Sequence, residues 1–272
     1  MRIEFDKELA RGIEAYEDVL GRWWFGQSSN DAHRRAYRRI ADYIALSFRD
    51  SPGAIVDYAC GAGNLLYRLA TRFPHSRLIG LDGSSYLLTL AQRRLSRLGE
   101  GTLARVFCVR TVLPNFDLRL KANLVVFAFP NLMPGDAKDP PGQVESRPAP
   151  EDLLAARGMV KGNDEEDSTY RELLRSRIVS QNLRGLLYRG GHCVRVEYAS
   201  MRRDEMTRAE VKRAAFEEGS FECEAAGRPR KPWFRVLAST YFESGVIEDV
   251  FHQTKDARDR RGGYQITVLR AV

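Results

Sequence analysis

The chain has 272 residues, of which 43% are hydrophobic and 29% are charged, and its formal net charge is +7 at pH 7. This length suits one α/β domain with additions better than two full domains, and the composition is typical of a globular protein. No apolar run reaches the length of a membrane span, and the N-terminus lacks the apolar core of a signal peptide, so the sequence predicts a soluble, cytoplasmic protein.

The cysteines and the positive charge do not point to a metal or to one class of partner. The four cysteines are scattered without a CxxC pair, which favours reduced buried thiols over disulfides and predicts no metal site. A basic chain raises the possibility of a nucleic-acid partner. The arginines are spread along the whole chain, however, so a solvated surface is the favoured explanation.

Residues 1–50 precede the first predicted core strand and are expected to form a helical cover, or lid. A helical stripe of apolar residues runs from Leu9 to Leu20, and a second helix is predicted over Ala32–Ser47. Between them the aromatic segment Gly21–Gly26 is expected to interrupt the helix. Its Trp pair fits either simple packing or a lid over a pocket. The candidate substrate-binding residues of the cover are Tyr16, Trp23, Trp24 and His33.

From Pro52 onward, predicted strands alternate with predicted helices. The strands are Ala54–Tyr58, Arg77–Asp82, Ala104–Val109, Ala122–Phe129 and Gly191–Tyr198. The helices follow the first strand to about Arg72, then span Tyr86–Leu98 and Thr169–Tyr188. Such alternation predicts a doubly wound parallel sheet with right-handed crossovers.

The C-terminal region is predicted to close the sheet at one edge. After a helix over Trp233–Phe242, the strands Val246–Thr254 and Tyr264–Ala271 are expected to form an antiparallel hairpin. Insertions are expected at about 131–168, as a lid or a disordered segment, and at about 200–230. The predicted fold is therefore α/β, a mainly parallel seven-stranded sheet with this edge hairpin, in a domain over 51–272 behind the cover of 1–50.

Two glycines in the segment after the first strand indicate a ligand site. A Cβ at Gly61 or Gly63 would obstruct a ligand approaching the backbone, and Asp82 ends the neighbouring strand. Dinucleotide sites also combine a glycine turn with such an acid. Their GxGxxG pattern needs a third small residue, where this chain has Leu66, which argues against NAD.

The segment Val56–Asn64 resembles motif I of the class I S-adenosylmethionine (SAM)-dependent methyltransferases. Leu78–Asp82 resembles their motif II, and Tyr188–His192 resembles the glycine lead-in to their fifth strand. The resemblance covers about residues 54–130 and 171–272. It implies a Rossmann-like transferase that uses SAM as its cofactor and methylates O, N or C of a small-molecule acceptor.

The resemblance also implies a set of cofactor-binding residues. Asp82 would accept both ribose hydroxyls, a role compatible with capping the next helix, and Asp57 would hold the turn or reach the ammonium through water. The family's acid after strand three is missing here, so Val112 and Leu113 are expected at the adenine. The full set is Asp57, Cys60, Gly61, Ala62, Gly63, Asn64, Asp82, Gly83, Val112, Leu113 and Phe129.

Candidate catalytic residues follow strands four and five, where doubly wound sheets bind ligands. They are Asn131, which could orient an acceptor or simply make a turn, and Tyr198. The segment Phe129–Leu132 is not the N/D-P-P-Y/F motif of base and amine methyltransferases. His33 is a candidate base, whereas His192 is expected at the opposite end of the sheet. The alternatives are an RNA or protein methyltransferase that uses a basic surface, or a non-catalytic SAM- or NAD-binding module.

Overall fold

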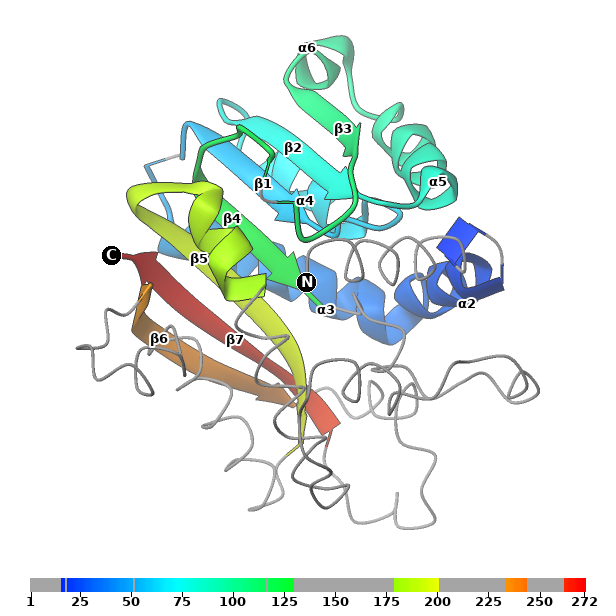
Figure 1. The fold of residues 1–272 in the computed structure, drawn as a ribbon. Coiled ribbons are helices and arrows are strands. Elements are labelled where there is room, and N and C mark those ends of the chain that lie inside the picture. Colours follow the sequence, from blue (N-terminus) through cyan, green and yellow to red (C-terminus); the bar gives the residue numbers. More distant parts are fainter. Residues whose placement is uncertain are drawn as a thin grey trace, which may run out of the picture.

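A computed structural model describes residues 16–17, 19–50, 52–115, 117–129, 179–200, 233–243 and 262–272. Seven strands in these ranges form one sheet (Figure 1). They are β1 (Ala54–Tyr58), β2 (Arg77–Asp82), β3 (Val106–Arg110), β4 (Ala122–Ala128), β5 (Leu187–Ser200), β6 (Phe234–Glu243) and β7 (Gly262–Ala271). Their order across the sheet is β3-β2-β1-β4-β5-β7-β6.

The first five strands run parallel, β7 runs in the opposite direction, and β6 beyond it again has the direction of β5. β1 lies between β2 and β4, while β7 pairs antiparallel with both β5 and β6. Ile55, Val56 and Tyr58 of β1 are fully buried, as expected for a central parallel strand covered on both faces. The predicted fold class is confirmed. The strand order reverses between β1 and β4, and ligands of such sheets bind outside the carboxyl ends at that point.

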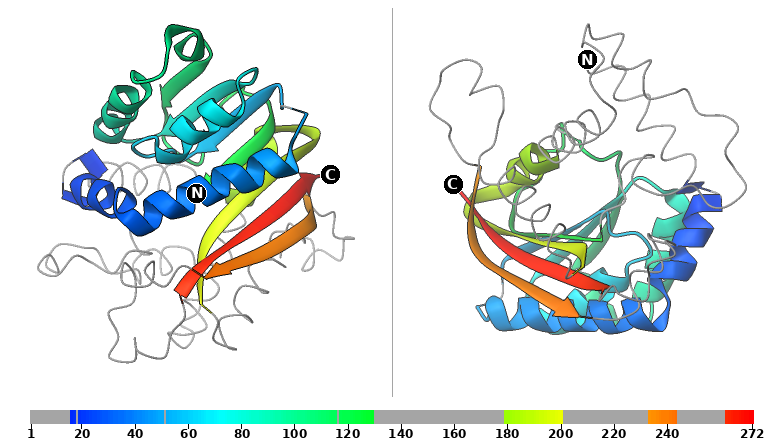
Figure 2. Two further views of the ribbon diagram at one scale, coloured as in Figure 1. Left: turned by 180° about the vertical axis from the view of Figure 1, so that it is seen from behind. Right: turned by 90° about the horizontal axis from the view of Figure 1, so that it is seen from below.

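Helices cover both faces of the sheet (Figure 2). On one face lie α3 (Asp31–Ser47) and α4 (Asn64–Arg72), with α2 (Val19–Ser28), α5 (Ser85–Leu95) and the short α6 (Glu100–Leu103) nearby. A helical segment over 179–185 covers the other face, where Val179 and Leu183 pack with Val56 and Val125. Two apolar cores result, one on each side of the sheet.

The expected interruption at Gly21–Gly26 is wrong, because α2 continues through both glycines. Gly21 lets the Tyr16 carbonyl and the Tyr86 ring lie close to the backbone of α2. A Cβ on Gly21 would lie 2.0 Å from the Tyr16 carbonyl oxygen and 3.1 Å from the Tyr86 ring. The helix therefore uses a glycine where a larger residue would collide with its neighbours, and burial of Trp24 compensates for the lower helix propensity.

The expected helix over Trp233–Phe242 is also wrong, since this segment forms the edge strand β6. A register shift between Val236 and Ala238 disrupts the two-residue alternation by which a strand is recognised in a sequence. An antiparallel pair closes this edge of the sheet as predicted, but it joins β6 to β7 rather than Val246–Thr254 to β7. The segment Val246–Thr254 and both predicted insertions lie outside the described residues.

The remaining differences are shifts of element ends. The helix after β2 ends at Leu95 rather than Leu98, and the third strand begins at Val106 rather than Ala104, after a turn that follows α6. β5 begins at Leu187, four residues before the predicted Gly191. Cys60, Cys108 and Cys193 are free thiols, while Cys223 lies outside the described ranges. No described helix is long and apolar enough to span a membrane.

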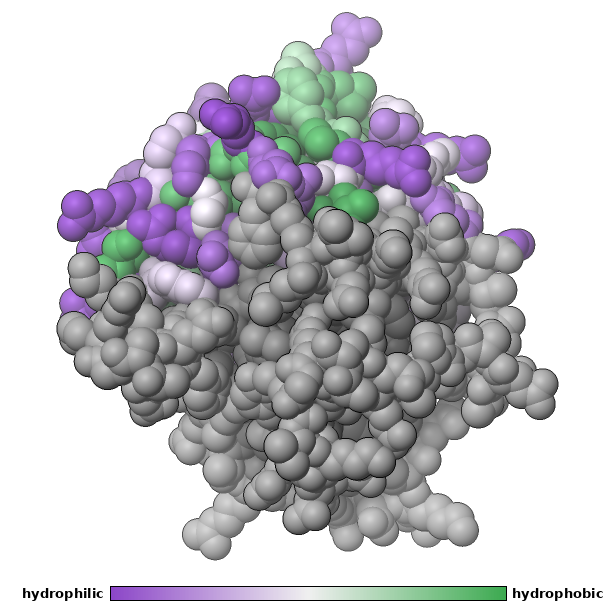
Figure 3. Space-filling view, in the orientation of Figure 1, coloured by the Kyte–Doolittle hydropathy of each residue, from purple (hydrophilic) through white to green (hydrophobic). Residues whose placement is uncertain are grey.

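The surface around the upper end of the molecule is mostly hydrophilic (Figure 3). Apolar side chains also gather there, at the end that holds α6 and the edge strand β3. Leu103, Phe107 and Val112 are the large apolar side chains of that region with substantial exposure. Much of the surface of a folded protein is apolar, so a few exposed apolar side chains need no ligand to explain them.

Candidate functional site

The turn after β1 has a backbone that few residues adopt. Ala59, Gly61 and Gly63 all have positive φ, at 58°, 53° and 70° respectively. Alanine is uncommon in this conformation, and its strain is typical of a functional turn. The three residues reverse the chain from the carboxyl end of β1 into α4, so Gly61 lies at the edge of the sheet where ligands bind.

Asp82 ends β2 beside this turn and holds it. Its Oδ2 accepts a hydrogen bond from the Gly61 N–H at 2.8 Å, and its Oδ1 accepts one from the Ser84 N–H at 3.0 Å. Burial raises the pKa of the Asp82 carboxyl, although the N–H groups of Ser84, Gly61 and Gly83 oppose that rise. Each carboxylate oxygen has two lone pairs, so both can still accept a further donor such as a ribose hydroxyl.

The helix after β2 is capped by Ser84 and not by Asp82. The Ser84 hydroxyl oxygen accepts the Leu87 N–H at 3.1 Å, which is the usual N-cap contact. Asp82 therefore does not have to cap this helix in addition to binding a ribose. Its carboxylate belongs to the turn rather than to the helix.

Asp57 is buried under the turn and is only 2% exposed. Burial, followed by the nearby charge of Asp82, raises the pKa of the Asp57 carboxyl to about 8, and a hydrogen bond from the Leu66 N–H opposes this. Its Oδ2 has no hydrogen-bond partner among the described residues. The bond to Leu66, in the first turn of α4, fits the expected role of holding the glycine turn.

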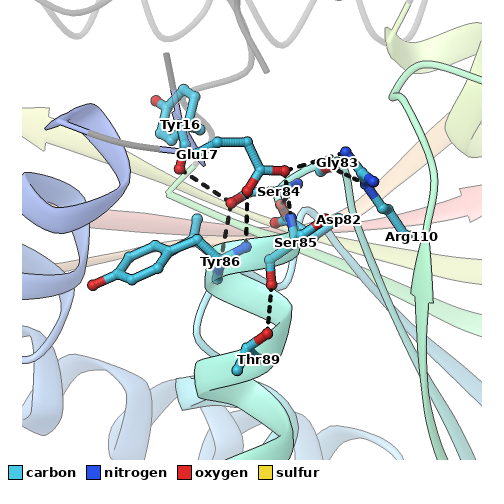
Figure 4. A network of polar contacts seen from close by, with 10 residues as sticks. Tyr16, Glu17, Asp82, Gly83, Ser84, Ser85, Tyr86, Thr89 and Arg110 are labelled. Atoms are coloured by element: carbon cyan, nitrogen blue, oxygen red, sulfur yellow. Dashed lines mark hydrogen bonds and ion pairs between the residues drawn. The ribbon is translucent and has the colours of Figure 1, made fainter. Parts of the chain in front are cut away.

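The chain before α2 crosses the other side of Asp82 (Figure 4). The carboxylate of Glu17 accepts the N–H groups of Ser85 at 2.7 Å and Tyr86 at 2.9 Å, at the start of α5. The Tyr16 carbonyl accepts the Ser84 hydroxyl at 3.1 Å. Glu17 was not predicted, because nothing in its local sequence distinguishes it from any other acid of an amphipathic helix.

Arg110, at the end of β3, contacts both Glu17 and Gly83. Its guanidinium lies 3.3 Å from the Glu17 carboxylate and donates through Nε to the Gly83 carbonyl at 3.2 Å. The Arg110–Glu17 ion pair therefore lies at the end of β3, where the sequence lacks the acid that the methyltransferase family usually has. Of the predicted adenine contacts close by, Leu113 is buried and Val112 is 41% exposed.

An aromatic cluster covers the carboxyl end of β4. Phe129 has φ 52° and is buried, and its ring contacts His33 and Tyr37 at centroid distances of 5.5 Å and Tyr264 at 5.8 Å. The Trp24 ring lies 6.2 Å from that of His33. A Cβ on Gly61 would lie 3.7 Å from the indole nitrogen of Trp24. The cover thus packs over the ends of both β1 and β4.

His33 is fully buried in this cluster. Burial lowers the pKa of its imidazole to about 4, so the ring is neutral near pH 7. Its Nδ1 lies 3.1 Å from Asn30 Oδ1, which also accepts the His33 backbone N–H. An amide oxygen only accepts, so Nδ1 carries the proton and Nε2 is the acceptor nitrogen. A role in substrate binding or proton transfer stays a prediction.

The other predicted cofactor residues are placed less directly. The Asn64 amide donates to the Ser28 carbonyl at 3.1 Å, which ties α4 to the end of α2. A Cβ on Gly63 would lie 2.9 Å from the Ala91 Cβ, so packing against α5 requires glycine there, and its expected contact with a ligand stays a prediction. Cys60 and Ala62 are buried in the turn, and Trp23 is half-buried in the cover.

The predicted catalytic residues are only partly described. Asn131 lies outside the described residues, and for Tyr198 only the backbone is described, paired with Tyr264 of β7. His192 contacts Phe48 at the far end of the sheet, with ring centroids 5.1 Å apart, as expected for a residue remote from the site. Within the described ranges no group of three His, Cys, Asp or Glu side chains could hold a metal ion.

The central part of the chain is similar to known methyltransferases. Residues 55–136 match the family model described as a methyltransferase domain. The chain is 43% identical over 58 residues to trans-aconitate 2-methyltransferase of Acidovorax sp. (strain JS42), and 41% identical over 58 residues to the enzyme of that name from Yersinia pestis (strain Pestoides F). These matches span 21% of this chain and 22% of each relative.

Solved structures share the fold along nearly the whole chain. Magnesium protoporphyrin IX methyltransferase from Synechocystis PCC 6803, with bound SAM, aligns with a TM-score of 0.56 and 12% identity over 97% of both chains. The [4+2]-cyclase SpnF aligns with a TM-score of 0.53 and 14% identity, over 89% of this chain and 84% of that one. The chain therefore has the class I methyltransferase fold.

Proposed function

The chain has the class I methyltransferase fold and matches a methyltransferase domain over its central part. We propose that this protein is a SAM-dependent methyltransferase that acts on a small-molecule acceptor. The observation that carries the proposal is the hydrogen bond between Asp82 Oδ2 and the Gly61 N–H. It joins the acid at the end of β2 to the glycine turn after β1, beside the point where the strand order reverses. A carboxylate that could accept the ribose hydroxyls, Asp82, thus lies next to a backbone without a Cβ, at Gly61.

The residues of this turn fit SAM by their chemistry. Asp82 has lone pairs for the ribose hydroxyls, and Gly61 presents a backbone without a Cβ to the methionine part. Gly83, Val112 and Leu113 are proposed for the adenine end. When bound, SAM supplies a methyl group that is already electrophilic. The protein's own contribution is to hold an acceptor in line and to exclude water.

The aromatic cluster is proposed to exclude water from the site. Trp24, His33, Tyr37 and Phe129 pack over the carboxyl ends of β1 and β4 and form a buried, largely apolar cover. The neutral His33 imidazole adds no charge to it. Such surroundings suit a small organic acceptor better than a charged polymer. Asn131, which follows β4 in the sequence, and Tyr198 of β5 remain the residues proposed to contact the acceptor.

The identity of the acceptor needs its own experiment. The relatives named for trans-aconitate match about a fifth of this chain, and one protein of the same fold is named as a cyclase. Fold and cofactor therefore do not specify the reaction. Organic acids are a reasonable first panel of acceptors, to be incubated with the protein and SAM carrying a labelled methyl group.

Calorimetric titration with S-adenosylhomocysteine and, separately, with NAD tests the cofactor. We expect one site per chain for S-adenosylhomocysteine and no displacement of it by NAD. Binding of NAD without S-adenosylhomocysteine would refute the proposal. If S-adenosylhomocysteine binds but no acceptor in a broad panel is methylated, a non-catalytic SAM-binding module becomes the better description.

A further inference from the structure

A cavity on the helical side of the molecule has no place in the proposed reaction. It has a volume of about 250 Å³ and lies among the α2–α3 turn, α4 and the C-terminal end of α5, with Ser29, Arg34, Asn64, Arg68, Arg94 and Arg97 in its wall. These elements lie together in the view from behind (Figure 2, left). Gly61 and Asp82 do not line this cavity; Asn64 of the predicted cofactor set does, and its amide donates to the Ser28 carbonyl.

Four guanidinium groups line this one cavity, which we call the arginine pocket. Arg68 and Arg94 are half-buried, whereas Arg34 and Arg97 are exposed. Arg34 forms an ion pair with Asp31 on the surface. In the part of the chain that the structure describes, no acidic side chain lies within ion-pair distance of the other three. The pocket therefore concentrates positive charge that its own walls leave uncompensated.

The electrostatic surroundings of Arg94 agree with this description. Burial is the largest cause that lowers the pKa of its guanidinium, and the charges of Arg97, Arg68 and Arg34 lower it further. The Tyr37 hydroxyl opposes them. Arg68 likewise has a lowered pKa, through burial first and then Arg38 and Arg72, with Asp42 acting against them. Both groups would be stabilised by an anion placed between them.

A second and independent observation comes from Ser29. Its hydroxyl oxygen is buried in the pocket wall and has no hydrogen-bond partner among the described residues. A buried hydroxyl without a partner costs stability, and this cost disappears when an acceptor arrives. The unpartnered hydroxyl and the uncompensated guanidiniums therefore require the same kind of group, a hydrogen-bond acceptor that carries negative charge.

We propose that the arginine pocket binds a small multivalent oxyanion, namely the phosphate groups of a phosphorylated molecule. Guanidinium groups bind phosphate through paired hydrogen bonds, and several of them around one cavity select for more than one negative charge. The volume is below the usual range for drug-sized ligands, which favours a pyrophosphate-sized group over a larger one. SAM has no phosphate, so this ligand is not the cofactor.

Calorimetry with pyrophosphate on the full-length protein tests the proposal, with sulfate for comparison. We expect saturable binding of one pyrophosphate per chain and weaker binding of sulfate. Arg94→Gln should reduce the affinity about tenfold or more, because a charge-assisted pair is lost. Arg97→Gln, at an exposed position, serves as a second variant that does not disturb the core.

Arg93→Gln is the matched control. Arg93 is adjacent to Arg94 on α5, is exposed, does not line the pocket, and loses the same charge when substituted. Its affinity for pyrophosphate should stay within about twofold of the wild type, since only long-range charge changes. An equal loss in Arg93→Gln and Arg94→Gln, or the absence of saturable binding, would overturn the proposal.

A single-stranded RNA oligonucleotide distinguishes a discrete pocket from a diffuse basic surface. If the pocket is the phosphate site, pyrophosphate should compete with the oligonucleotide, and Arg94→Gln should weaken both ligands. Oligonucleotide binding that is insensitive to pyrophosphate and equally reduced by Arg93→Gln would count against the proposal and favour a nucleic-acid surface. S-adenosylhomocysteine binding, measured in parallel, reports on the cofactor turn alone.

Discussion

The Asp82 carboxylate accepts the Gly61 N–H at 2.8 Å, across the 21 residues that separate them in the sequence. This bond sets the position of the glycine turn relative to β2. The carboxylate oxygens keep lone pairs for further donors, such as the hydroxyls of a ribose. A change at Asp82 should therefore affect binding of the cofactor more than it affects folding.

Asp82→Asn should weaken S-adenosylhomocysteine binding by about 1–3 kcal/mol, because an amide offers one acceptor oxygen where the carboxylate offers two. Titration calorimetry measures the change, and circular dichroism checks that the variant is folded. Asp50→Asn, at an exposed position before β1, removes the same charge and should leave affinity unaltered. Unchanged affinity in Asp82→Asn would exclude this carboxylate from the cofactor site.

Gly63→Ala should destabilise the fold by about 2–4 kcal/mol, from the positive φ and from overpacking. The added Cβ would lie 2.9 Å from the Ala91 Cβ, and neither helix can move away cheaply. Gly61→Ala has the same kind of φ but no overpacking, since the nearest atom, Trp24 Nε1, would be at an ordinary contact distance of 3.7 Å. It should lose about 1–2 kcal/mol of stability and, in addition, cofactor affinity.

Thermal unfolding and calorimetry separate these two glycine variants. Gly63→Ala should be the less stable protein, and Gly61→Ala the one with the larger loss of affinity relative to its loss of stability. Equal stabilities would mean that α5 shifts to accommodate the methyl group. If the loss of affinity relative to the loss of stability were the same in Gly61→Ala and Gly63→Ala, Gly61 would not face the cofactor.

The central strands could be predicted because their causes are local. β1 and β2 are short apolar runs bounded by turn residues, and the structure has both at their predicted bounds. Asp57 and Asp82 were placed correctly relative to the turn for the same reason. Glu17 could not be found this way, since its partner Ser85 is 68 residues distant and no periodicity links them. In β6 the register shift removed the alternation that identifies a strand.

Asp57 should make stability fall as the pH rises. Its pKa is about 8 in the folded protein and about 3.9 in an unfolded chain, so between these values the folded state holds a proton that the unfolded state has lost. The free energy of unfolding should therefore decrease from about pH 4 to pH 8, by an amount of the order of a few kcal/mol.

Asp57→Asn tests that dependence, because an amide imitates the neutral acid. Urea denaturation at several pH values between 5 and 8 should show a flatter profile for Asp57→Asn than for the wild type, and a stability advantage for the variant that grows with pH. The buried His33 titrates in the opposite direction, since its pKa of about 4 makes stability fall as the pH drops below about 6.5. Parallel profiles for both proteins would show that Asp57 is ionised in the folded state.

Glu17→Gln should cost about 0.5–1 kcal/mol at pH 7, because a charged group leaves the N-terminus of α5. Burial alone would raise the pKa of the Glu17 carboxyl, but the N–H groups of Ser85 and Tyr86 lower it overall. A carboxyl with a lowered pKa stabilises the fold above its unfolded value and loses that contribution as the pH falls. The difference between wild type and Glu17→Gln, measured by urea denaturation, should therefore shrink below about pH 4.5.

The control for this charge is Glu100→Gln, which removes an exposed acid from the first turn of α6 without a bond to another element. It should change stability by less than about 0.5 kcal/mol, as expected of exposed positions. Glu17→Gln should also weaken S-adenosylhomocysteine binding, since Glu17 orders the chain beside Asp82 and Gly83, whereas Glu100→Gln should not. If both variants lose the same stability and neither alters binding, Glu17 contributes surface charge only and does not support the cofactor turn.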